Sequence, residues 1–224
     1  IGMKKLKMLG CVGLLLALTA CQAGTGNSAD SNKAAEQKIA ISSEAAISTM
    51  EPHTAGDPTS TLVMNQVYEG LYVLGKEDEL ELGVAAEEPA ISEDETVYTF
   101  KIREDAKLSN DDPVTANDFV YAWQQVASPK SGSIHQALFF DVIKNAKEIA
   151  LEGADVNTLG VKALDDKTLE ITLERPTPYL KSLLSFPVLF PQNEKYIKEQ
   201  GDKYATDAEH LIYNGPFKLK EWDN

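Results

Sequence analysis

The feature that most constrains this chain is its N-terminal segment, which joins positive charge to a short apolar run. Three lysines fall within residues 3–7, and an uncharged stretch of 13 residues follows from Met8 to Ala20. A helix needs about 18 apolar residues to span a bilayer, so this stretch is too short to do so. The pattern predicts an export signal over residues 1–20.

The apolar stretch ends in Leu18-Thr19-Ala20-Cys21, which resembles a bacterial lipobox. In that motif the cysteine receives a diacylglycerol thioether and becomes the first residue after cleavage. Cys21 is therefore a predicted lipidation site, and several acyl chains together would give a stable membrane anchor. The alternative is an ordinary buried cysteine beside a secretory signal.

Acylation of Cys21 limits how the exported chain can be stabilised. The only other cysteine, Cys11, lies in the predicted signal, so the folded part has neither a disulfide nor a thiolate zinc site available. Residues 21–37 are rich in Gly, Ser, Asn and Ala, which predicts a flexible tether spanning roughly 20–25 Å. The folded part should begin near residue 38 and depend on the packing of its core.

The composition excludes one class of partner. Hydrophobic residues make up 43% and charged residues 25% of the chain, as in ordinary globular proteins. Acidic residues outnumber basic ones by 35 to 21, and the formal net charge is −14. Nucleic acid would be repelled over most of such a surface, so no nucleic-acid partner is expected.

Short strands are predicted to alternate with helices, which indicates a mixed α/β fold. Helices are predicted from Pro58 with Asp57 as the cap, after the capping box Thr115–Asp118, over Ile134–Ile149, up to Leu183 and over Glu194–Gln200. Strands are predicted at Ile39–Ile41, in a hairpin that includes 97–102, in a second hairpin of 160–164 and 168–173, and after a turn within 213–219.

Six short segments occur in an order typical of one protein family. They are Glu69-Gly70-Leu71-Tyr72, Tyr98-Thr99-Phe100, Pro113 to Trp123, Leu159 to Leu169, Pro176-Thr177-Pro178-Tyr179 and Asn214-Gly215-Pro216-Phe217. Through them the chain, from about residue 38 to its end, resembles the oligopeptide-binding lipoproteins of ABC peptide importers, the extracellular solute-binding proteins of family 5. Members are usually much longer, so the chain resembles the N-terminal portion of one.

The resemblance implies a periplasmic-binding-protein-like fold in which two lobes enclose the ligand. Residues 38–68 and 193–224 would form an incomplete first lobe, and residues 69–192 an extra domain. The second lobe would follow Asn224.

The resemblance also implies a function. The protein would capture oligopeptides and hand them to ABC transporter permease subunits, as a monomer held by its lipid anchor at the extracytoplasmic face of the cell membrane. Affinity for many sequences must come from the backbone groups and termini that all peptides share. The alternatives are a nickel chelate, haem or a peptide pheromone on the same fold, or a surface lipoprotein that senses or adheres.

The ligand-contacting loop of the family matches Thr54–Thr59, so Ala55, Gly56, Asp57, Pro58 and Thr59 are predicted to contact the ligand. Gly56 would permit close backbone approach, and Asp57 could either cap the following helix or bind a ligand amine.

Three further positions carry less specific predictions. His135 stands where the family often has a ligand-contacting tyrosine, and its alternative is an exposed histidine at a helix start. Asn214 and Gly215 are predicted to form a structural turn near the hinge, with ligand contact as the alternative.

Some residues are expected to serve packing or turn geometry alone. Asp111 replaces the glycine of the family's Ser-Asn-Gly-Asp turn and is expected to take a left-handed conformation. Trp123 and Trp222 are predicted to be packing residues.

Neither catalysis nor metal binding is expected from the sequence. The three histidines, His53, His135 and His210, are scattered, and none lies in a Gly-x-Ser-x-Gly elbow. No His-x-x-x-His pair or calcium-type carboxylate loop appears, so we expect no enzyme, metal site or cofactor.

Overall fold

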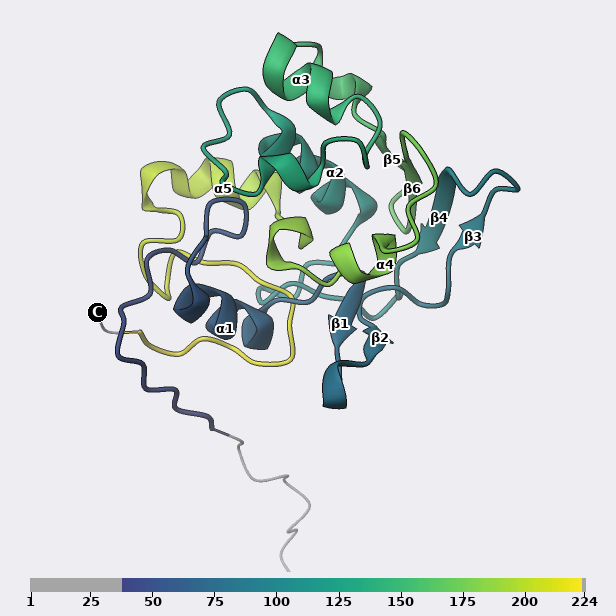
Figure 1. The fold of residues 1–224 in the computed structure, drawn as a ribbon. Coiled ribbons are helices and arrows are strands. Elements are labelled where there is room, and N and C mark those ends of the chain that lie inside the picture. Colours follow the sequence, from purple (N-terminus) through teal and green to yellow (C-terminus); the bar gives the residue numbers. More distant parts are fainter. Residues whose placement is uncertain (1–37, 223–224) are drawn as a thin grey trace, which may run out of the picture. The chain divides into compact units, whose positions relative to one another are not determined.

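The structure is a computed structural model that describes residues 38–222, and residues 41–222 belong to one compact unit. The predicted signal, the tether and Cys21 lie outside the described residues. Helices and strands both contribute, as predicted (Figure 1). The helices are α1 (Pro58–Val67), α2 (Ala116–Ala127), α3 (Ala146–Glu152), α4 (Leu180–Leu183) and α5 (Glu194–Gln200). The strands are β1 (Tyr72–Leu74), β2 (Leu80–Leu82), β3 (Ala90–Ile91), β4 (Val97–Lys101), β5 (Val161–Asp165) and β6 (Thr168–Thr172).

The main sheet has four antiparallel strands in the order β3-β4-β6-β5. Both predicted hairpins, β3–β4 and β5–β6, are confirmed. They are joined by the long-range pair β4–β6, whose register runs from Val97 opposite Thr172 to Lys101 opposite Thr168. A smaller antiparallel hairpin is formed by β1 and β2.

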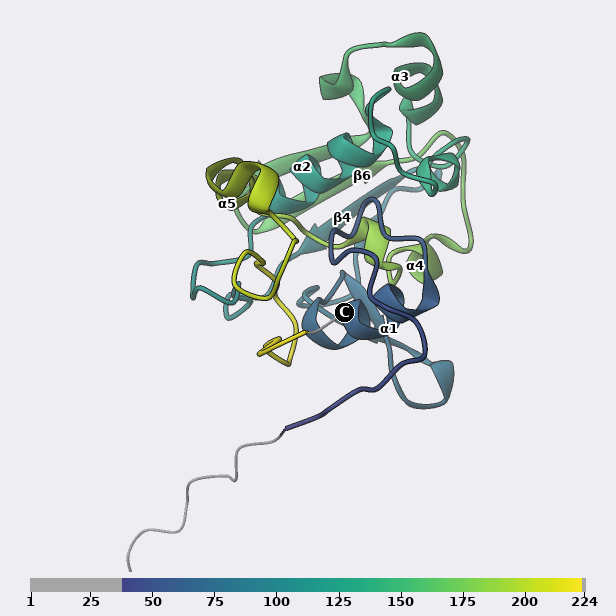
Figure 2. The same cartoon turned by 90° about the vertical axis from the view of Figure 1, so that its left-hand side faces the viewer.

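Helix α2 lies along one face of the main sheet (Figure 2). Its predicted start is confirmed, because Asp118 accepts a hydrogen bond from the backbone N–H of Thr115 at 2.8 Å. Trp123 is fully buried, donates from Nε1 to the carbonyl oxygen of Leu189 at 3.0 Å and meets the ring of Phe139 edge-on. Its predicted packing role is confirmed.

Helix α1 begins at Pro58 as predicted and ends at Val67, where Tyr68 takes an extended backbone conformation. The last carbonyl groups of the helix bind a distant segment. The N–H of Gly215 donates to the carbonyl oxygen of Val67 at 2.7 Å, and that of Phe217 to Gln66 at 3.3 Å.

The buried side chains form two apolar clusters. One contains Trp123 and draws its buried members from 71–189 and Ile212, and the other contains Met50, Met64, Tyr68 and Tyr213. This division falls close to residues 69 and 192, where the resemblance places the domain boundaries. Because 41–222 form one compact unit, the domain division itself stays a prediction.

The predicted helix Ile134–Ile149 is wrong. Only a short 3-10 turn, Gln136–Leu138, and α3 form in this region. Asp141 and Asn145 have φ values of 56° and 62°, which breaks a right-handed helix. The intervening backbone binds the end of strand β6 instead, since the N–H of Lys144 donates to the carbonyl oxygen of Thr172 at 3.0 Å.

Two predicted strands are also absent from the described residues. Ile39 and Ile41 are 60% and 43% exposed, and no strand ladder within 38–222 includes Ile39–Ile41 or 213–219. A strand needs a hydrogen-bonded neighbour, whereas 213–219 gives backbone bonds to the end of α1.

Other local predictions hold. Asp111 takes the expected left-handed conformation with φ of 71°, and α5 has the predicted bounds. No helix within the described residues is long and apolar enough to cross a membrane.

Candidate functional site

The candidate loop is the segment Thr54–Thr59, which is predicted to contact the ligand. Within it, Asp57 caps the start of α1. Its carboxylate accepts hydrogen bonds from the backbone N–H of Ser60 at 2.8 Å, from the Ser60 hydroxyl at 2.6 Å and from the Ser48 hydroxyl. The capping role of Asp57 is therefore confirmed, and contact of Asp57 with a ligand stays a prediction.

These hydrogen bonds decide the ionisation of Asp57. Burial raises the pKa of this carboxyl, but the bonds from Ser48 and Ser60 outweigh burial and lower the pKa to about 2. The carboxylate is thus charged at neutral pH, and its oxygens already accept hydrogen bonds from the first turn of α1.

The middle of the loop is buried on one side and exposed on the other. Ala55 is 4% exposed and belongs to the cluster around Met64, and its N–H donates to the carbonyl oxygen of Glu51 at 3.0 Å. Gly56 is exposed, as is Pro58. Ligand contact here would therefore use the backbone of Gly56 and the ring of Pro58 rather than the side chain of Ala55.

His135 reaches this loop although it lies 80 residues further along the chain. Its Nε2 is 2.9 Å from the carbonyl oxygen of Ala55. The side chain of the neighbouring Ile134 lies against one side of Gly56, since a Cβ added at residue 56 would collide with the Cδ1 of Ile134. The predicted contact residue His135 therefore lies beside the predicted ligand-contacting loop Thr54–Thr59. Its ring contacts the backbone of that loop and not a ligand.

Thr59 lies in the first turn of α1, and its hydroxyl is 3.1 Å from the hydroxyl of Ser43. This places Thr59 beside the segment that precedes the loop. Its predicted ligand contact is untested.

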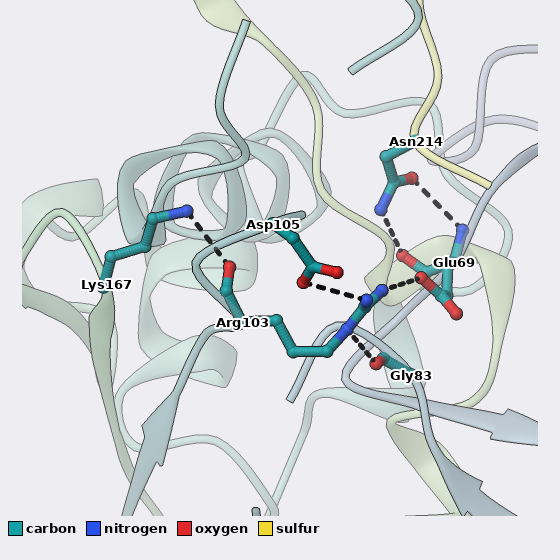
Figure 3. A network of polar contacts seen from close by, with 6 residues as sticks. All are labelled: Glu69, Gly83, Arg103, Asp105, Lys167 and Asn214. Atoms are coloured by element: carbon teal, nitrogen blue, oxygen red, sulfur yellow. Dashed lines mark hydrogen bonds and ion pairs between the residues drawn. The ribbon is translucent and has the colours of Figure 1, made fainter. Parts of the chain in front are cut away.

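Asn214 and Gly215 clamp two distant segments together. The Nδ2 of Asn214 donates to the carbonyl oxygen of Glu69 at 2.8 Å, and its Oδ1 accepts from the N–H of Glu69 at 3.1 Å (Figure 3). A Cβ at Gly215 would lie 2.5 Å from the carbonyl carbon of Val67. Both positions thus have a structural role, and ligand contact by either stays a prediction.

A partly exposed ion pair extends from these contacts of Asn214 and Gly215. The Nη2 of Arg103 lies 3.0 Å from the carboxylate of Glu69, and its Nε donates to the carbonyl oxygen of Gly83 at 3.0 Å (Figure 3). Burial raises the pKa of Glu69, while Arg103 opposes that rise. No sequence pattern pointed to Arg103, because its partners Glu69 and Gly83 lie in other segments.

The histidines do not gather. His53 lies 3.4 Å from the carboxylate of Glu51, and His210 binds Asp207 at 2.7 Å. Within residues 38–222, no group of three or more His, Cys, Asp or Glu side chains is arranged to hold a metal ion.

Comparison with known proteins decides the family. The sequence model of the bacterial extracellular solute-binding proteins, family 5 Middle, matches residues 79–224. This chain belongs to that family. The predicted resemblance is confirmed.

Curated relatives match nearly the whole chain. The dipeptide-binding protein DppE of Bacillus subtilis is 38% identical over 229 residues, which cover 98% of this chain and 42% of DppE. The chain thus spans about two fifths of the length of this relative.

Solved structures of bacterial binding proteins share the fold. Listeria monocytogenes OppA bound to peptide has a TM-score of 0.75 and 48% identity, covering 78% of this chain and 34% of that one. The pheromone receptor PrgZ has a TM-score of 0.76 and 41% identity, covering 80% and 35%. The predicted type of fold is confirmed.

The cap at Asp57 predicts a pH-dependent loss of stability in Asp57→Ala. At pH 7 this change should lower the free energy of unfolding by about 1 kcal/mol, because the first turn of α1 loses its acceptor. The folded pKa lies below the unfolded value of about 3.9, so this stabilisation is complete above about pH 4 and is lost as pH falls through about 2. Urea unfolding at several pH values measures the difference.

Asp57→Asn is the matched control, because it keeps a side-chain oxygen at the cap and has no charge to titrate. A difference between Asp57→Ala and the unsubstituted chain that persists unchanged at pH 2 would contradict the role of the carboxylate.

The clamp predicts that Asn214→Ala destabilises the chain by about 2 kcal/mol, because the N–H and C=O of Glu69 lose their partners. Chemical unfolding measures this loss. Asn157→Ala, at an exposed asparagine that binds Asp155, should cost clearly less. Equal effects of the two substitutions would show that the clamp adds little.

Proposed function

We propose that the complete gene product is a lipid-anchored extracytoplasmic receptor that captures oligopeptides and delivers them to the permease of an ABC transporter. The observation that most supports this proposal is the similarity to Listeria monocytogenes OppA bound to peptide, at 48% identity and a TM-score of 0.75. The name of DppE, a dipeptide-binding protein, supports the same class of ligand.

The loop Thr54–Thr59 suits a ligand that is recognised by its backbone. Its two ends are fixed, by Glu51 on one side and by the Asp57 cap on the other. A rigid loop loses little conformational entropy on binding, and exposed Gly56 has no side chain of its own to cover its backbone. Such a surface favours main-chain contacts, which peptides of every sequence can make.

We further propose that the receptor binds without chemical turnover. The carboxylate of Asp57 caps a helix, and His135 Nε2 contacts a backbone carbonyl oxygen. Acyl transfer of the serine type requires a histidine base paired with a hydroxyl or thiol, whereas His135 Nε2 is occupied by the carbonyl oxygen of Ala55. The proposal includes no cofactor.

A second candidate is the sensing of a peptide pheromone, favoured by the likeness to the pheromone receptor PrgZ at 41% identity. Both candidates predict a peptide ligand. They differ in whether the peptide is one defined sequence or a mixture.

Peptide capture is tested with the complete gene product. Mass spectrometry of molecules eluted from the purified protein, and calorimetric titration with a mixed peptide pool, should both detect peptides. A broad mixture would support nutrient import, and one dominant sequence would support sensing. Absence of eluted peptide together with absence of heat, or release of a chemically altered ligand, would contradict the proposal. The 224-residue chain alone should bind peptides weakly or not at all.

Lipid anchoring is tested separately in bacterial cells. The unsubstituted protein should incorporate labelled palmitate and sediment with membranes, whereas Cys21→Ser should lose the label and appear in the soluble fraction. Cys11→Ser is the matched control. Because Cys11 lies within the predicted signal, this substitution should leave the labelling unchanged. Labelling that survives Cys21→Ser would refute Cys21 as the lipidation site.

A further inference from the structure

The segment 131–136, here called the strap, connects the end of α2 to the candidate loop. The Nε2 of Gln136 donates to the carbonyl oxygens of Val126 at 3.1 Å and Ser128 at 2.8 Å. These carbonyl groups lie at the C-terminal end of α2, where backbone acceptors lack partners within the helix. The strap is therefore fixed to a helix that packs on the main sheet.

The strap is also ordered internally. The hydroxyl of Ser133 accepts the N–H of His135 at 3.2 Å, and the hydroxyl of Ser131 accepts the N–H of Ser133 at 3.2 Å. Just beyond the strap, Phe139 is buried against Trp123. His135 is thus presented from a segment that is held on both sides.

The contact between His135 and Ala55 has only one chemical interpretation. A carbonyl oxygen accepts hydrogen bonds and cannot donate, so Nε2 must carry the hydrogen at its distance of 2.9 Å. The N–H of Ala55 is in turn bound to Glu51. Both polar backbone groups of Ala55 are therefore occupied, and they hold the loop in one conformation.

Ile134 has the opposite character. Its side chain is 70% exposed, yet its Cδ1 lies so close to Gly56 that a Cβ there would collide with it. An exposed apolar side chain therefore borders the exposed backbone of Gly56. A ligand lying along Gly56 would meet this side chain.

We propose that His135 is a positioning residue, which fixes the loop through Ala55, and that Ile134 is the residue of the strap that meets the ligand. Ile134 then favours peptides with an apolar side chain at the position beside Gly56. The apolar preference rests on the proposed capture of peptides, whereas the positioning role of His135 does not.

The positioning role is tested without any ligand, in the complete gene product. Nitrogen NMR should show a hydrogen on Nε2 of His135. Hydrogen exchange of the Thr54 and Ala55 amides, which both bind the Glu51 carbonyl, should accelerate roughly five- to tenfold in His135→Ala.

His135→Gln offers an amide donor of similar reach and should restore slow exchange at both amides. His210→Ala, at the histidine that binds Asp207, is the matched control and should leave them unchanged. The absence of a hydrogen on Nε2, or unchanged exchange in His135→Ala, would overturn the positioning role. The nitrogen NMR result needs no substituted protein, so it decides even if His135→Ala fails to fold.

The apolar preference is tested with alanine peptides that carry leucine or aspartate at one position in turn. At one position the unsubstituted protein should prefer leucine, and Ile134→Ser should reduce that preference about fivefold. Ile91→Ser, an equal change at an exposed isoleucine on β3, is the control.

The outcomes separate the two proposals. Binding of peptides with the same leucine preference in Ile134→Ser would overturn the role of Ile134 and leave the proposed function intact. Failure of the unsubstituted protein to bind any peptide would overturn the proposed function and the apolar preference together. The exchange experiment would then still decide the role of His135.

Discussion

The antiparallel pairing of β4 with β6 is the interaction on which the rest of the structure depends. Each of these strands belongs to a local hairpin, and a hairpin alone is marginally stable in water. Their pairing brings Phe100 opposite Leu169 and Tyr98 opposite Ile171, and all four side chains are buried. The resulting sheet gives α2 a surface on which to bury Phe119 and Trp123.

From this sheet, two sets of contacts reach the candidate site by separate routes. Just beyond β4, Arg103 binds Glu69, whose backbone is held by Asn214 (Figure 3). At the end of α2, Gln136 fixes the strap, and His135 then binds Ala55. Because both routes start from rigid elements, the loop before α1 and the segment after it are each placed by long-range contacts.

Local chemistry in the sequence predicted much of the fold, since caps and hairpin turns act between close neighbours. Asp57 with Pro58, and Thr115 with Asp118, mark helix starts that the structure confirms. The helix predicted over Ile134–Ile149 is wrong because the spacing of apolar residues carries no information about left-handed residues or about backbone groups that bind a distant strand. For the same reason, the sequence could place His135 and Ala55 in the site only through resemblance, and it could not show that they bind each other.

The polar side chains that are hydrogen-bonded within the protein limit how this part of the chain can recognise a ligand. The polar groups of Asp57, His135 Nε2 and Asn214 are all occupied by hydrogen bonds within the protein. Breaking such a bond to bind a ligand would leave a partner unsatisfied at a cost of about 1–3 kcal/mol. The groups that remain exposed at the loop are the backbone of Gly56 and the apolar Pro58 and Ile134. Recognition through such groups depends little on polar side chains of the ligand, as the proposed capture of many peptide sequences requires.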